Sequence, residues 1–113
     1  MSFLHCNKPE IDLGDEVDPY DMKVYEGGRD ALLNFIAKGY IKKDEQQTMY
    51  IYQQTMGHHT QKALVGLASN KDYAENRIKK HEFTLPKKEL DRTNLIDIQN
   101  ASLEPVFLTF KDN

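Results

Sequence analysis

The feature that most constrains the fold is a pair of strand-forming runs on either side of a short polar turn. Residues 48–55 are rich in β-branched and aromatic side chains, and residues 61–69 form a second apolar run. Between them lies Met56-Gly57-His58-His59-Thr60, where Gly57 supplies backbone angles that other residues adopt only at a cost. The sequence therefore predicts a β-hairpin over about 48–55 and 61–69.

Two stretches have the pattern of helices. Over about 24–38, the apolar side chains fall on one stripe, and Gly39 follows as a stop. The stripe consists of Tyr25, Leu32, Phe35 and Ile36. A second helix is expected over about 86–100. It begins after Thr84 or Leu85, because a proline such as Pro86 is tolerated in a first turn, where its missing N–H is not needed.

Shorter elements complete the expected fold. Residues 2–6 and 106–110 are predicted as strands, with Cys6 a small buried side chain on the first, and residues 71–77 as a short helix. The prediction is one α+β domain over residues 1–113, with a mixed sheet around the central hairpin and two main helices.

Composition excludes some classes of protein. A net charge of −3 over 113 residues disfavours nucleic-acid binding, which relies on many uncompensated cations. No apolar run is long enough to cross a bilayer, so no membrane partner is expected. The first residues lack the pattern of a signal peptide, and the lone Cys6 cannot form an internal disulfide. We therefore expect a cytoplasmic protein.

Charge is concentrated in residues 78–92, around the expected start of the second helix. At helical spacing, Lys88 and Arg92 are four residues apart and share a face with Asp91. A helix N-terminus with nearby cations suits a phosphate or carboxylate, and His81 or Glu82 would move a proton there. The alternative is a solvated helix whose Lys–Glu and Asp–Arg pairs face water. Both interpretations remain open from these residues alone.

Metal sites are not predicted. His58-His59 lies in the turn, but neither H-E-x-x-H nor C-x-x-C occurs, and adjacent turn histidines are more often simply exposed. The acidic residues 15–21 lack the ligand spacing of a calcium loop. The sequence does not identify a cofactor.

Several runs along nearly the whole chain resemble those of one bacterial family, the domain-of-unknown-function family DUF1015. They are Ser2-Phe3-Leu4-His5, Lys8-Pro9-Glu10-Ile11-Asp12-Leu13, Asp18-Pro19-Tyr20-Asp21, Tyr50-Ile51-Tyr52, Ile78-Lys79-Lys80-His81-Glu82, Thr84, Lys88-Glu89, Asp91-Arg92-Thr93, and Asn100-Ala101 leading to Pro105-Val106-Phe107-Leu108-Thr109. Each run alone is weakly specific, and their combination in this order is highly specific.

The resemblance implies a longer parent protein. Family members begin before the first of these runs and continue to an Asp-Gly-His-His-Arg motif that is similar to one in ParB-like and sulfiredoxin-like proteins and in free-serine kinases. Gly57-His58-His59-Thr60 imitates part of that motif without its Asp and Arg, so its role is not transferred to these histidines. The chain is expected to be an internal fragment, inactive by itself.

The resemblance also implies a chemistry. It suggests part of a cytoplasmic phosphate-ester enzyme that handles serine, phosphoserine or a nucleotide, as a serine kinase-like or phosphoserine-handling enzyme would. Lys88, Arg92 and Thr84 would bind the anion, and His81, Glu82 and Asp91 would be catalytic, with Glu82 or Asp91 as a base or metal ligand. The expected partner is a small anionic or phosphorylated ligand.

The rival hypothesis is a non-catalytic interaction or oligomerisation domain. Its basic segment would dock an acidic partner or the acidic N-terminal loop of a second copy. Exposed sheet edges and apolar surface would favour a homo-oligomer.

Overall fold

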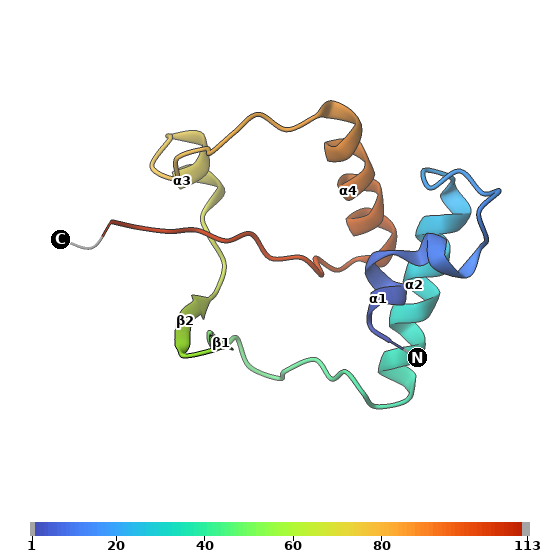
Figure 1. Ribbon diagram of the computed structural model, residues 1–113, viewed down its shortest axis with the longest axis horizontal. Helices are drawn as coiled ribbons and strands as arrows, with labels where there is room; N and C mark the ends of the chain where they lie inside the picture. Colours follow the sequence, from blue (N-terminus) through green and yellow to red (C-terminus); the bar gives the residue numbers. More distant parts are fainter. Residues whose placement is uncertain (1, 112–113) are drawn as a thin grey trace. The chain divides into compact units, whose positions relative to one another are not determined.

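The computed structural model describes residues 2–111. The described residues divide into two compact units (Figure 1). Lys43–Phe83 forms the second unit, and the chain before and after it forms the first.

The first unit is built on α2, Met22–Ala37. Asp21 caps its N-terminus by accepting a hydrogen bond from the Lys23 backbone N–H at 2.9 Å. Gly39, with φ +73°, lies just past its end, where a left-handed residue commonly stops a helix. The predicted helix over 24–38 is therefore confirmed. Its buried residues recur at helical spacing and form one continuous face: Val24, Tyr25, Gly28, Ala31, Leu32 and Phe35.

The N-terminal segment is helical, so the strand predicted over residues 2–6 is wrong. It forms α1, Leu4–Asn7, followed by the 3-10 helix η1, Pro9–Asp12. Short apolar runs do not distinguish strand from helix, and here packing decides. In a helical turn, Phe3 and Cys6 face the same side, which allows Phe3 to meet Phe35 edge-to-face at 6.0 Å while Cys6 is fully buried.

The second long helix, α4, spans Pro86–Gln99 and confirms the prediction of a helix over 86–100. Leu85 is its N-cap, and Pro86 occupies the first turn as expected. Figure 1 shows α4 beside α2, on which it packs through the buried Leu95 and Gln99. The Gln99 amide donates a 2.6 Å hydrogen bond to the Cys6 carbonyl, which ties α4 to α1.

The second unit contains the hairpin. β1, Tyr50–Met56, pairs antiparallel with β2, His59–Val65, from Tyr50 opposite Val65 to Met56 opposite His59. Gly57, with φ +60°, takes the first place of a two-residue turn, where a hairpin favours glycine. β2 begins before residue 61, the predicted start, and ends before residue 69, the predicted end. It ends early because β1 provides no partner beyond Tyr50. The short helix α3, Asn70–Ala74, covers the first part of the predicted helix over 71–77.

Residues 106–110 form no strand, which corrects the second short strand prediction. Strand propensity expresses how well a side chain packs on neighbouring strands, and this run pairs with none among residues 2–111. The described elements remain those of an α+β fold with two main helices and an antiparallel hairpin. Within residues 2–111, no helix is both long enough and apolar enough to cross a membrane.

Candidate functional site

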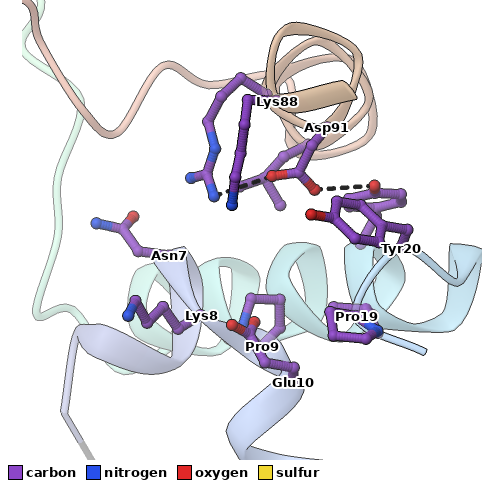
Figure 2. A pocket seen from close by; sticks show the side chains of 12 residues that line it. Asn7, Lys8, Pro9, Glu10, Pro19, Tyr20, Lys88 and Asp91 are labelled. Carbon is purple, nitrogen blue, oxygen red and sulfur yellow. Dashed lines mark hydrogen bonds and ion pairs between the residues drawn. The ribbon is translucent and has the colours of Figure 1, made fainter. Parts of the chain in front are cut away.

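The first unit contains a pocket of about 160 Å³ where α1, η1 and α4 meet at the N-terminal half of α2. Figure 2 shows Lys88 and Asp91 extending from α4 towards the segment that carries Asn7 and Lys8. The floor is apolar, because Val24 of α2 and Leu95 of α4 are buried there. Polar side chains therefore surround a small hollow with an apolar base, a form common among ligand sites.

Three cations line this pocket: Lys8, Lys88 and Arg92. Lys88 and Arg92 lie one helical turn apart on α4, and Lys8 follows α1 on another wall. The structure thus brings together Lys88, Asp91 and Arg92 of the sequence-predicted site, as their spacing on one helix requires.

Asp91 connects the pocket to the core through a hydrogen bond from a buried tyrosine. The Tyr25 hydroxyl donates to Asp91 Oδ1 at 3.0 Å, and Arg92 Nη2 lies 3.1 Å from Asp91 Oδ2. Both carboxylate oxygens are therefore occupied, and the Asp91 side chain is only 12% exposed. The second guanidinium nitrogen, Arg92 Nη1, donates to Glu104 Oε2 at 3.1 Å. Asp91 and Glu104 together fix the orientation of Arg92.

Tyr25 is 3% exposed, and burial raises the pKa of its hydroxyl above the ordinary range, with the bond to Asp91 adding to the effect. The hydroxyl remains protonated at neutral pH and acts as a fixed donor. A second tyrosine, Tyr20, forms part of another wall, with the Lys87 ammonium 4.1 Å from the centre of its ring.

Three predicted site residues lie elsewhere. Thr84 is exposed outside the pocket, and its hydroxyl donates to Glu89 Oε2 at 3.0 Å. His81 and Glu82 belong to the second unit and are exposed there. Neither is among the residues that line the pocket of the first unit.

Sequence reasoning missed the opposite side of the pocket, formed by Asn7, Lys8, Glu10, Tyr20 and Tyr25. A signal was present, because Lys8-Pro9-Glu10 and Pro19-Tyr20 lie within runs that carry the family resemblance. Those runs and the one over residues 88–92 converge on this pocket from distant parts of the sequence.

The unpaired groups define what the pocket offers a ligand. Within residues 2–111, the side chains of Lys8, Lys88 and Glu10 form no ion pair with another side chain, although all three line the pocket. Asn7 Oδ1 is buried and accepts no hydrogen bond from any residue in that range. Within the described residues, no group of three side chains that could hold a metal ion is found.

The chain was compared with family models, with curated proteins and with solved structures. The model of a family described as "Protein of unknown function (DUF1015)" matches residues 1–113, the full length of the chain. No curated protein and no solved structure matches.

Proposed function

The chain belongs to the DUF1015 family, and we propose that it supplies the anion-binding part of a site for a small phosphorylated ligand. In this proposal the ligand binds in the pocket between α4 and the α1–η1 segment. Lys88 and Arg92 contact its phosphate, and Lys8 adds a third positive charge.

One observation carries this proposal: three cations from two segments of the chain line one small pocket, and two of them, Lys8 and Lys88, have no anionic side-chain partner within residues 2–111. Like charges around one pocket repel each other, and a bound anion offsets that repulsion. A phosphate that accepts hydrogen bonds from two or three of them would supply that anion, through charge-assisted bonds that are stronger than neutral ones.

The contacts of Asp91 favour a positioning role over proton transfer. Both of its carboxylate oxygens already interact, one with Tyr25 and one with Arg92. In the proposed site Asp91 keeps the Arg92 guanidinium turned towards the phosphate, so that its orientation is set before the ligand binds.

The finer assignment follows the family resemblance. We propose a cytoplasmic phosphate-ester enzyme of serine metabolism, with phosphoserine, serine or a nucleotide as the ligand. Proton transfer by His81 or Glu82 and anion contact by Thr84 remain proposals. Because this chain is expected to be inactive by itself, Glu82→Gln and His81→Gln are tested by phosphoserine turnover in a full-length family member that carries this sequence, and Thr84→Val by calorimetric titration of phosphate into the chain.

The anion site is tested by calorimetric titration of inorganic phosphate and of O-phosphoserine into the wild-type chain and Lys88→Met. Loss of one charge-assisted contact at an exposed position is expected to weaken binding about tenfold. Lys23→Met is the matched control, because Lys23 is an exposed lysine near the start of α2 that does not line the pocket. Equal weakening by both substitutions, or none by Lys88→Met, would contradict the proposal.

A second candidate function, self-association or partner docking, is favoured by the hairpin surface. Every residue of β1 is exposed, including Ile51 at 78%, and Leu64 opposite it is 67% exposed. Exposed apolar side chains on a two-stranded sheet, whose outer edges pair with no further strand, are typical of an interaction surface. Light scattering after size exclusion would detect an oligomer of the wild-type chain that Ile51→Lys with Leu64→Lys disperses. A monomer at all concentrations would contradict self-association.

A further inference from the structure

We infer that the ligand of the pocket is a phosphorylated amino acid, whose protonated amine is bound by Glu10 while its anionic groups are bound by Lys88, Arg92 and Lys8. This inference rests on the proposed function and deepens it, because it chooses between the amino-acid and nucleotide ligands.

The first argument comes from the charges left unpaired in the pocket. Asp91 and Arg92 are paired with each other, and Arg92 also with Glu104. Among the described residues, the lining charges that form no ion pair are two ammonium groups, Lys8 and Lys88, and the Glu10 carboxylate. A ligand complementary to this set carries more negative than positive charge but has at least one cationic donor. A phosphorylated amino acid at neutral pH has this pattern.

The positions of these charges also favour a ligand with a negative and a positive end. Lys88 extends from α4, whereas Glu10 belongs to η1, and Figure 2 shows the two on opposite sides of the pocket. Glu10 is also half-buried, which makes an uncompensated carboxylate costly. A molecule that spans the pocket with its phosphate near α4 would place its amine near η1.

Asn7 supports the same assignment. It lines the pocket on the Glu10 side, and its Oδ1 is a buried acceptor with no donor in the part of the chain that the structure describes. Most buried acceptors in proteins have a partner, since an unsatisfied one is destabilising. If the Asn7 amide turned towards the ligand, the ligand's amine would supply the missing hydrogen-bond donor. A nucleotide phosphate supplies no ammonium group at this position.

The small volume of the pocket also favours a phosphorylated amino acid over a nucleotide. The pocket measures about 160 Å³, whereas sites for drug-sized ligands enclose roughly 300–1,000 Å³. An amino-acid phosphate is compatible with the smaller volume, but a nucleoside diphosphate would place its base and sugar outside.

The test compares two ligands that differ at one group. O-Phosphoserine and 3-phosphoglycerate have the same carboxylate and phosphate, but the second has a hydroxyl in place of the ammonium. Calorimetry with the wild-type chain is expected to give about tenfold tighter binding of O-phosphoserine, the effect of one charge-assisted contact. ADP is expected to bind more weakly than O-phosphoserine.

The variants assign this preference to a residue. Glu10→Gln is expected to remove most of the preference by weakening O-phosphoserine alone, and Glu10→Asp to retain part of it. Glu26→Gln, a matched change on the exposed side of α2, is expected to retain all of it. Lys88→Met is expected to weaken both ligands equally.

The outcomes separate the two proposals. Equal wild-type affinities, tighter binding of ADP, or an unchanged preference in Glu10→Gln would overturn the amine assignment while Lys88→Met still reports the anion site. Absence of binding by both phosphate esters would overturn the proposed function together with this inference. The wild-type comparison needs no variant, so a Glu10 variant that fails to fold leaves the test intact.

Discussion

Gly28 lies where three segments of the first unit come closest together. A Cβ added there would lie 2.6 Å from Gln99 Nε2, 3.1 Å from Pro9 Cγ and 3.2 Å from the Cys6 carbonyl oxygen. The neighbouring Gly27 would place its Cβ 3.8 Å from Pro9, an ordinary contact. One glycine is therefore required by packing and the other is not.

These two glycines form a matched pair for a stability measurement. Gly28→Ala is expected to lower the free energy of unfolding by about 1–3 kcal/mol, because the hydrogen bond from Gln99 to Cys6 must shift. Gly27→Ala is expected to raise it by about 0.5–1 kcal/mol, since alanine favours the helix. Urea denaturation of both variants measures the difference. Equal effects would mean that α1, α2 and α4 do not meet at Gly28.

The buried Tyr25 hydroxyl predicts a loss of stability at high pH. Its raised pKa means that the unfolded chain loses the phenolic proton first, near pH 10, while the folded chain retains it. The free energy of unfolding should therefore fall as the pH rises above about 10 and should not change from this group at lower pH. Tyr25→Phe has no proton to lose, so its decline should be shallower.

The control for this experiment is Tyr40→Phe, at an exposed position. The pKa values of Cys6 and Tyr50 are also raised, Cys6 by burial and Tyr50 mainly by its hydrogen bond to Asp44, and both contribute equally to the two variants. Urea denaturation at about pH 8 and pH 10.5 measures the decline. The same decline in Tyr25→Phe and Tyr40→Phe would contradict burial of the Tyr25 hydroxyl.

If Arg92 binds an anion as proposed, Glu104 would compete with that anion for the guanidinium group. The pair is exposed, with side chains 45% and 55% accessible, and such pairs contribute about 0.2–1 kcal/mol. Glu104→Gln should therefore strengthen phosphate binding by up to about fivefold, because one guanidinium nitrogen is released. Calorimetry in the Arg92→Gln background should show no gain. Weaker binding by Glu104→Gln alone would indicate that Glu104 supports the site.

At the scale of the elements, the sequence predicts those whose signals are local. The stripe and stop of α2, the first-turn proline of α4 and the glycine turn of the hairpin each specify their element without distant contacts. The segments 2–6 and 106–110 carry apolar runs without such signals. Contacts with α2 make the first helical, and the second has no strand partner within residues 2–111.

The candidate site follows the same division. Helical spacing alone places Lys88, Asp91 and Arg92 on one face. The opposite wall depends on how α1 and η1 pack on α2 and on the loop that carries Tyr20, which no periodicity in the sequence reports. The buried donor to Asp91, Tyr25, reads in the sequence as one more apolar position of α2.

The rate of backbone amide hydrogen exchange should differ between the elements according to how deeply each is buried. α2 buries six residues, whereas every residue of β1 is exposed, and an isolated hairpin is marginally stable. Hydrogen exchange followed by mass spectrometry is expected to show slower exchange in Val24–Phe35 than in Tyr50–Met56. Equal protection of the two segments would indicate that the hairpin is covered in solution.

At the scale of the whole molecule, the candidate site is assembled across a long stretch of sequence. The residues that line the pocket lie within 7–25 and 88–95, and Lys43–Phe83 forms a separate unit between these ranges in the chain. A bound ligand should therefore link the two stretches of chain that form the first unit. Both line the pocket, the N-terminal stretch through α1 and α2 and the C-terminal stretch through α4.

The most direct test of the central claim, that this pocket binds a phosphorylated ligand, is an NMR titration of the labelled wild-type chain with O-phosphoserine. We expect the largest changes in amide chemical shift to fall together on residues 7–10 and 88–92, and Lys88→Met to reduce them at equal ligand concentration. Shift changes confined to other residues, or none at millimolar ligand, would contradict it.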